Sequence, residues 1–235
     1  MTVTQSGYAR QKNDLYETSE WVTRALLRFF RFNKLNVVDP CFGRGKMAHV
    51  IKEQEGAHVF GIDIAHYGGP EPDLLADFLS LETADLEGLQ IDGFVMNPPY
   101  GTQNRTAVAF IKKALELVDP EAGIVAALVP SNIDFGKTRT DLFRDNPHFA
   151  AEIVLLDRIT WFEPTIKDVA ISKKTGKPYM PTPTNDHKWV VWDMAHSGPP
   201  EKYYAEMPVA EAKRLSSKRQ EVLEAWRDAN ERFAA

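Results

Sequence analysis

The chain has 235 residues, of which 43% are hydrophobic and 26% are charged, and its formal net charge is −5. These values fit one α/β domain with a modest appendage and a sizeable core. They argue against a protein that coats nucleic acid through an overall positive charge. Cys41 is the only cysteine, which excludes an intrachain disulfide. No apolar run approaches the roughly 18–20 residues of a membrane helix, and no signal peptide is evident, so we expect a soluble, cytoplasmic protein.

Hydrophobic periodicity and turn residues predict alternating helices and strands after a flexible, polar N-terminus over residues 1–15. Helices are predicted at 21–32, 46–55, 107–118, 139–144 and 208–235, and strands at 35–39, 58–64, 74–79, 93–96, 123–129, 151–156 and 188–194. We therefore expect one domain over 16–200, with a loop insertion near 163–187, and a C-terminal amphipathic helix within 201–235. This alternation is typical of a mainly parallel, doubly wound sheet, which binds ligands outside the carboxyl ends of its strands.

The most distinctive motif is Asn97-Pro98-Pro99-Tyr100, directly after the predicted buried strand 93–96. A small polar residue, two prolines and an aromatic residue arise in this order by chance in roughly 1% of chains of this length. A rigid turn is the alternative interpretation, because two prolines also make a good turn.

This loop is chemically suited to activating the exocyclic amine of adenine, whose lone pair is delocalised into the ring. The Asn97 side-chain oxygen and the Pro98 carbonyl can accept the two N–H groups of that amine. Two fixed acceptors favour a more tetrahedral nitrogen and free its lone pair towards an electrophile. The prolines hold the carbonyl in position, and the Tyr100 ring can stack on a base that is flipped out of its helix.

Three weaker signals lie at the ends of the preceding predicted strands. The turn from Asp39 to Gly45 contains Phe42 and two glycines, Gly43 and Gly45, which let the backbone approach a ligand, although an ordinary strand-to-helix turn has the same pattern. Asp63 ends the second strand and can accept hydrogen bonds from two ribose hydroxyls. Asp77 and Phe78 follow the third, where they can bind a purine or serve as a cap and a core residue.

These motifs, in this order, resemble those of the DNA amino-methyltransferases with an Asn-Pro-Pro-Tyr motif, in particular the small adenine-specific enzymes of phages and orphan modification systems. The resemblance covers roughly residues 16–194. It implies a Rossmann-like, seven-stranded methyltransferase sheet, mainly parallel with one antiparallel strand at 188–194 and helices on both faces. It also implies S-adenosyl-L-methionine as cofactor and DNA, or alternatively RNA, as partner, in a bacterial cell or a phage-infected host.

By this resemblance, Asn97, Pro98, Pro99 and Tyr100 form the catalytic loop. The cofactor-binding set that it implies is Tyr16 and Thr18 near the methionine carboxylate, Asp39, Phe42, Gly43 and Gly45 around the methionine end, Asp63 and Ile64 at the ribose, and Asp77 and Phe78 at the adenine. The chain departs from the family pattern in having Thr18-Ser19 where Thr-Pro is frequent, Phe42-Gly43 where Cys-Gly is frequent, and Asp63 where Glu is more frequent.

No separate target-recognition domain is evident, so the predicted loop 163–187 is the candidate for specificity. It contains Lys167, Lys173, Lys174 and Lys177, which suit phosphates, although a merely solvated loop has the same composition. RNA adenine or cytosine-N4 methylation, protein-glutamine methylation and an inactive nucleic-acid-binding module remain alternatives. One cysteine and scattered histidines argue against a metal site.

Overall fold

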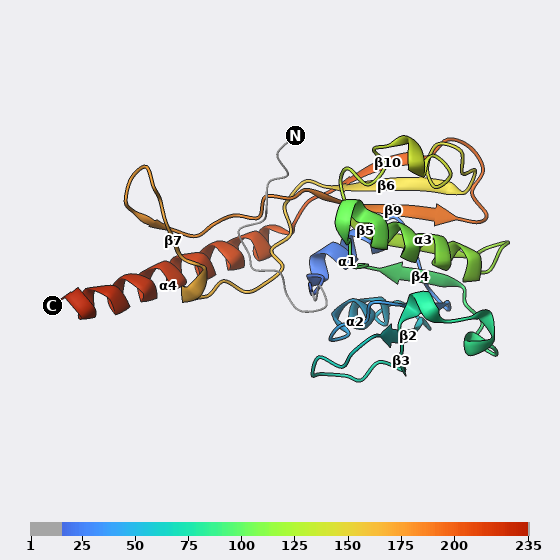
Figure 1. The fold of residues 1–235 in the computed structure, drawn as a ribbon, viewed down its shortest axis with the longest axis horizontal. Coiled ribbons are helices and arrows are strands. Elements are labelled where there is room, and N and C mark those ends of the chain that lie inside the picture. The colour runs from blue at the N-terminus through green and yellow to red at the C-terminus, as the bar shows by residue number, and fades with distance from the viewer. Residues whose placement is uncertain (1–15, 235) are drawn as a thin grey trace.

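The computed structural model describes residues 16–234, so the predicted flexible N-terminus at 1–15 lies outside the described residues. An eight-stranded sheet with the order β10-β6-β9-β5-β4-β1-β2-β3 forms the body of the protein (Figure 1). Its strands are β1 (Asn36–Asp39), β2 (His58–Asp63), β3 (Leu74–Leu75), β4 (Gly93–Met96), β5 (Ile124–Pro130), β6 (Phe149–Leu155), β9 (His187–Asp193) and β10 (Glu201–Ala205). The helices are α1 (Glu20–Leu27), α2 (Lys46–Ile51), α3 (Arg105–Leu117) and α4 (Val209–Ala234).

The strand directions confirm the predicted Rossmann-like fold class. β9 runs antiparallel to both β5 and β6, while the other neighbouring strands of this sheet pair in parallel. The predicted number of seven strands is wrong, because β10 adds an eighth at the edge, parallel to β6. The C-terminal helix, predicted at 208–235, begins at Val209, and the residues before it form β10, where the sequence predicts no strand. β10 is stabilised by its pairing with β6, by the Tyr203 ring, which stacks on Phe29 at a centroid distance of 4.3 Å, and by the burial of Ala205.

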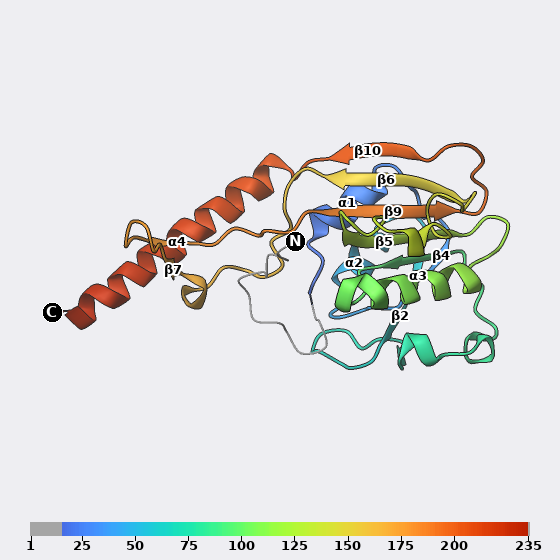
Figure 2. The same ribbon diagram turned by 45° about the horizontal axis from the view of Figure 1, so that its top comes forward.

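Helices cover both faces of the sheet and create two apolar cores. α1 and α2 pack on one face with side chains such as Val95 and Trp189, and α3 packs on the other with Phe94 and Trp192. Figure 2 shows α3 in front of the sheet and α1 and α2 behind it. The strands β4, β5 and β9 are buried on both faces, which explains the nearly continuous apolar sequences of β4 and β5 and the apolar run Trp189–Trp192 within β9.

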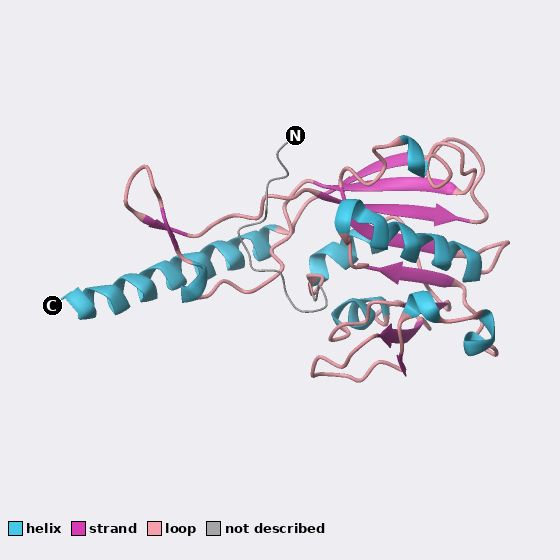
Figure 3. Cartoon of the chain, viewed as in Figure 1, coloured by secondary structure: helices cyan, strands magenta, loops and turns pink. Residues whose placement is uncertain are grey.

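The region between β6 and β9 differs most from the sequence-based expectation. The predicted loop 163–187 contains a second, two-stranded antiparallel sheet of β7 (Ala170–Ile171) and β8 (Pro178–Tyr179). This hairpin and α4 project together from one end of the body (Figure 3). The predicted helix 139–144 is only a short 3-10 turn, Lys137–Arg139. The predicted strand 74–79 ends at Leu75, because the Asp77 side chain accepts a hydrogen bond from the Leu79 N–H and starts another such turn.

Two negative findings concern the described part of the chain. Within residues 16–234, no helix combines the length and apolar character that crossing a membrane requires. Within the same residues, no three histidine, cysteine, aspartate or glutamate side chains gather in a way that can hold a metal ion.

Candidate active site

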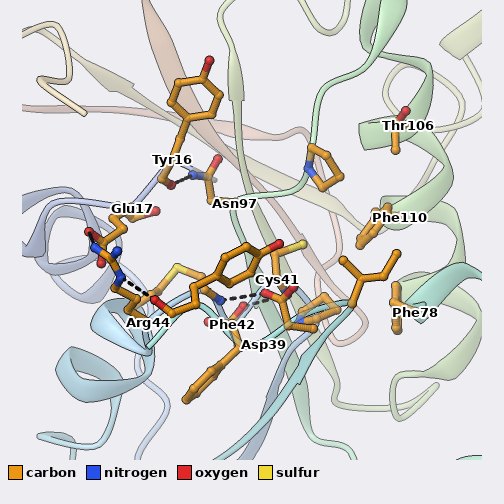
Figure 4. A pocket seen from close by; sticks show the side chains of 18 of the residues that line it. Tyr16, Glu17, Asp39, Cys41, Phe42, Arg44, Phe78, Asn97, Thr106 and Phe110 are labelled. Carbon is orange, nitrogen blue, oxygen red and sulfur yellow. Dashed lines mark hydrogen bonds and ion pairs between the residues drawn. The ribbon is translucent and has the colours of Figure 1, made fainter. Parts of the chain in front are cut away.

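A pocket of about 520 Å³ lies at the carboxyl ends of β1, β2 and β4, where a doubly wound sheet is expected to bind its ligand. Figure 4 shows Asn97 and Tyr16 at one end of it, and Phe78 and Phe110 on the side opposite Glu17 and Arg44. The structure brings together most of the predicted site residues as lining: Tyr16, Thr18, Asp39, Phe42, Gly43, Asp63, Ile64, Asp77, Phe78, Asn97 and Pro99. Gly45, Pro98 and Tyr100 are outside this lining.

The Asn97 side chain has a defined orientation. Its Nδ2 donates a hydrogen bond of 2.9 Å to the main-chain carbonyl of Tyr16, which precedes α1 and is 81 residues away in the sequence. Its Oδ1 accepts a hydrogen bond of 3.0 Å from the Tyr100 hydroxyl. An oxygen of this kind has two lone pairs, so one remains for a further donor. The carbonyl of Tyr16 therefore determines which end of the Asn97 amide serves as the acceptor.

Tyr100 is placed differently from the neighbouring loop residues. Its ring lies 5.8 Å from that of His187, with an interplanar angle of 34°. Burial raises the pKa of its hydroxyl well above the usual value, so the hydroxyl stays protonated and remains a donor to Asn97. The sequence motif predicted a role for the ring of Tyr100 and overlooked its hydroxyl.

A chain of ring contacts continues from Tyr100 towards the pocket. His187 lies edge-on to Trp161 at 5.1 Å, and Trp161 lies edge-on to Tyr16 at 5.7 Å. Burial lowers the pKa of His187 to about 4, so its ring is neutral at pH 7, and its Nδ1 has no hydrogen-bond partner among the described atoms. These rings connect the loop Asn97–Tyr100 to Tyr16, whose carbonyl orients Asn97.

Asp39 lies in the base of the pocket and is fully buried. Its Oδ1 accepts a hydrogen bond of 3.1 Å from the Cys41 N–H, whereas its Oδ2 is buried without a partner in the described part of the chain. Burial raises the pKa of this carboxyl to about 8, opposed by the Cys41 N–H and assisted by the nearby charge of Asp63. A buried carboxyl oxygen without a donor is costly, which is typical of a position awaiting a ligand.

The turn after Asp39 is held to the second strand by specific contacts. The Gly43 N–H donates a hydrogen bond of 2.8 Å to Asp63 Oδ2. The Phe42 ring packs over Gly45 and Gly61, and a Cβ atom at either glycine would overlap it. Gly45 thus shapes the pocket indirectly, with a φ of 72° that favours glycine. Gly61 was missed, although a glycine inside a buried strand is a signal of a close approach.

A charged cluster at the mouth of the pocket was also missed. Glu17 Oε2 lies 3.3 Å from both Arg44 Nη1 and Lys46 Nζ. The other oxygen, Glu17 Oε1, is buried without a partner among the described residues. Glu17 precedes α1, whereas Arg44 lies in the turn between β1 and α2 and Lys46 is the first residue of α2, so no local sequence pattern indicated that Glu17 meets them.

The apolar side of the pocket is formed by Phe78 and Phe110. Phe78 is 2% exposed, and its ring centroid lies 5.3 Å from that of Phe110 in α3. Asp77, before it, caps the 3-10 turn with its Oδ1, which accepts a 3.0 Å hydrogen bond from the Leu79 N–H. The two interpretations of this pair are therefore compatible, because both residues serve a structural role and line the pocket.

Comparison with known proteins identifies the fold. Scans of protein-family models and of curated protein sequences give no match. A structure from Listeria monocytogenes, named provisionally as a class I S-adenosylmethionine-dependent methyltransferase, is similar with a TM-score of 0.51 at 15% identity, over 87% of this chain and 68% of that one. The type I restriction-modification methyltransferase subunit from Streptococcus thermophilus gives a TM-score of 0.52 at 13% identity, over 88% of this chain and 53% of that one.

A protein from Lactococcus lactis, named provisionally as a hemolysin, matches with a TM-score of 0.51 at 12% identity, over 90% of this chain and 98% of that one. The present chain thus spans about half the length of the Streptococcus subunit, at 53%, but nearly all of the Lactococcus protein, at 98%. These similarities, together with the strand order of the eight-stranded sheet and its one antiparallel strand, β9, show that the chain has the Rossmann-like fold of class I S-adenosylmethionine-dependent methyltransferases.

Proposed function

We propose that this protein transfers a methyl group from S-adenosylmethionine to the exocyclic amine of adenine in DNA. The observation that carries the proposal is the orientation of Asn97, whose amide nitrogen is engaged by the Tyr16 carbonyl while its oxygen remains an acceptor beside the pocket. An amine is the kind of group for which such an acceptor is useful, because accepting an N–H bond raises the electron density on its nitrogen.

The pocket suits the cofactor in its size and in its polar groups. S-adenosylmethionine has an ammonium group, a carboxylate, a ribose and an adenine. The unpartnered oxygens of Asp39 and Glu17 suit the ammonium, and the cations of Arg44 and Lys46 suit the carboxylate. The remaining assignments are those implied by the family resemblance: Tyr16, Thr18, Phe42, Gly43 and Gly45 at the methionine end, Asp63 and Ile64 at the ribose, and Asp77 and Phe78 at the adenine.

The residues of this chain contribute to the reaction by binding and orientation. When bound, the cofactor supplies an electrophilic methyl group. Asn97 Oδ1 and the Pro98 carbonyl accept the two N–H groups of the target amine, and Pro98 and Pro99 keep that carbonyl fixed. Because the amine of a paired adenine is inside the duplex, the base must leave the stack to reach this loop.

The Tyr100 hydroxyl gives a prediction that follows from its hydrogen bond to Asn97. Tyr100→Phe is expected to lower kcat by about 10-fold, because one ordinary hydrogen bond that holds Asn97 is lost. Tyr100→Ala is expected to lower kcat further, since the ring contact with His187 is lost as well. Steady-state rates of both variants test this order. A Tyr100→Phe enzyme with unchanged kcat would assign the residue a role through its ring alone.

Asp63 gives a second prediction, on cofactor affinity. Asp63→Ala is expected to raise the Kd for S-adenosylmethionine by about 10- to 100-fold, because hydrogen bonds to a carboxylate are lost. Asp63→Asn is the matched control, since its side-chain oxygen can still accept from the Gly43 N–H and keep the turn in place. Calorimetric titration measures both variants, and a Kd of Asp63→Ala equal to that of the wild type would refute the assignment.

The substrate class is tested by transfer of labelled methyl from S-adenosylmethionine to unmethylated DNA, with RNA and a protein extract in parallel. We expect label in DNA. Label only in RNA or protein would retain the pocket chemistry and replace the substrate. Cofactor binding with no label in any of the three would contradict the proposal and favour a nucleic-acid-binding module.

A further inference from the structure

The β7–β8 hairpin lies on an arm, residues 156–186, that leaves the sheet at the carboxyl ends of its parallel strands, where the pocket also lies. β6 ends at Leu155, and β9 begins at His187, which pairs with the last residue of β5, Pro130. Residues 156–186 therefore both leave and rejoin the sheet at the carboxyl ends of its parallel strands. Figure 1 shows this arm and α4 extending beyond these ends of the strands. The arm and the pocket that contains Asn97 therefore lie at the same ends of the strands.

The outer part of the arm, residues 169–185, has a local charge opposite to that of the whole chain. Between Asp168 and Asp186 there are three lysines, Lys173, Lys174 and Lys177, and no acidic residue, although the chain has a net charge of −5. All three lysines are exposed. Among the side chains described for residues 16–230, no carboxylate forms an ion pair with any of them. Their positive charge is therefore available to a polyanion.

The turn that presents these lysines is ordered by its own hydrogen bonds. The Ser172 N–H donates to the Lys177 carbonyl at 3.0 Å, and the Gly176 N–H donates to the Ser172 carbonyl at 2.8 Å. Gly176 has a φ of 69°, which suits glycine in a tight turn. The backbone that presents the lysines thus has a defined shape. The hairpin therefore loses less backbone conformational entropy on binding a ligand than an open loop would.

The arm is also braced at its base. Arg158 donates a hydrogen bond of 2.8 Å to Asp186, which joins the outgoing and returning segments. Arg214 of α4 donates one of 2.7 Å to Glu163, which joins the outgoing segment to the helix. These pairs are exposed and each contributes little free energy, but together they define where the arm lies.

The strands of the hairpin expose groups that suit contact with nucleic acid. Tyr179 is 47% exposed and Ile171 is 50% exposed, in a hairpin where Ile171 pairs with Pro178. A two-stranded ribbon is narrow enough to enter the major groove of DNA. Lysines at the tip of such a ribbon, with an exposed aromatic ring behind them, form a surface for a polynucleotide backbone.

We propose that the hairpin, residues 170–179, binds the phosphate backbone of the polynucleotide whose target base enters the pocket. This inference rests on the proposed function for the class of substrate, and it assigns the arm a role in affinity that is independent of base sequence. Lys173, Lys174 and Lys177 each neutralise a phosphate and so release a condensed counterion.

The experiment compares two triple variants with the same change in charge. Lys173→Gln, Lys174→Gln and Lys177→Gln are combined in one protein. Arg28→Gln, Arg31→Gln and Lys52→Gln are combined in the control. These exposed residues lie in the connections that lead into β1 and β2, and so at the amino ends of the strands, opposite the pocket. The Kd for a short DNA duplex is measured by fluorescence anisotropy between about 50 and 200 mM salt, with the same titration on RNA of matching sequence.

We expect the hairpin variant to reduce the slope of log K against log salt by about 2–3, since each phosphate contact on duplex DNA contributes about 0.9. The control variant is expected to keep the wild-type slope, and both variants are expected to keep the wild-type Kd for S-adenosylmethionine. Equal slopes for the hairpin and control variants would overturn the inference, as would a wild-type protein that binds neither polynucleotide.

The same titrations separate this inference from the proposed function. Hairpin-dependent binding to DNA without methyl transfer would support the inference and contradict the proposed function. Methyl transfer to DNA, with DNA binding that does not depend on the hairpin lysines, would support the proposed function and contradict the inference. Hairpin-dependent binding to RNA alone would keep the phosphate contact and identify RNA as its source.

Discussion

Asn97→Ala is expected to lower kcat for methyl transfer by about 10²- to 10³-fold, because a pre-organised acceptor for the target amine is removed. The Kd for S-adenosylmethionine is expected to change by no more than about 3-fold, since Asn97 acts on the substrate and no cofactor contact is assigned to it. Single-turnover rates and calorimetric titration measure the two quantities on the same preparation. The separation of the two effects is the signature of a residue that acts in the transition state.

The control for this variant is Asn33→Ala, the same substitution at an exposed position between α1 and β1. This position is at the amino ends of the strands, opposite the pocket. It is expected to have wild-type kcat and Kd. Asn97→Ala also removes the hydrogen bonds to the Tyr16 carbonyl and from the Tyr100 hydroxyl, so thermal unfolding is followed to exclude loss of fold. Wild-type turnover by a folded Asn97→Ala protein would refute the catalytic assignment.

Asp39 gives the second large expected effect, which couples cofactor binding to protonation. With a pKa of about 8, the Asp39 carboxyl of the free protein is mostly protonated at pH 7. An ammonium group placed beside its unpartnered Oδ2 favours the ionised form, so binding at pH 7 is expected to release close to one proton. Asp39→Asn is expected to abolish this release and to raise the Kd by about 10- to 100-fold. Calorimetry in buffers of different ionisation enthalpy measures the proton count.

Stability provides the control for the Asp39 variant. Because burial raises the pKa of Asp39 in the folded state, the folded protein binds more protons than the unfolded chain between about pH 4 and 8, and its stability falls as the pH rises through this range. Asp39→Asn removes this dependence, so the cofactor-free variant is expected to melt at a higher temperature than the wild type near pH 8. Proton release unchanged by Asp39→Asn would assign the titrating group elsewhere, for example to Asp63, whose pKa burial also raises.

The sequence predicted the parts of the fold that depend on local pattern. The apolar strands that became β1, β2, β4, β5 and β9 are recognisable because they are buried on both faces or end in distinctive turns. β10 was missed because its sequence, Glu201–Ala205, is polar, and its stability comes from pairing with β6 and from Phe29. The hairpin β7–β8 was missed because each strand has only two residues.

The candidate site shows the same division between local and long-range information. Asn97 and Asp39 are recognisable from motifs that follow strands, and the structure places both in one pocket. The Tyr16 carbonyl that orients Asn97 cannot be found from a sequence motif. It is a main-chain group 81 residues away, and every residue type has such a carbonyl. The role of Glu17 was likewise hidden, since its partners are brought to it by the turn after β1.

The most direct test of the proposed activity is mass analysis of nucleosides from DNA incubated with the wild-type protein and S-adenosylmethionine, beside a reaction with Asn97→Ala. The account predicts N6-methyladenine in the wild-type reaction and its near absence with the variant. N4-methylcytosine, or no methylated nucleoside in DNA while the protein binds the cofactor, would contradict the assignment of adenine in DNA as the substrate.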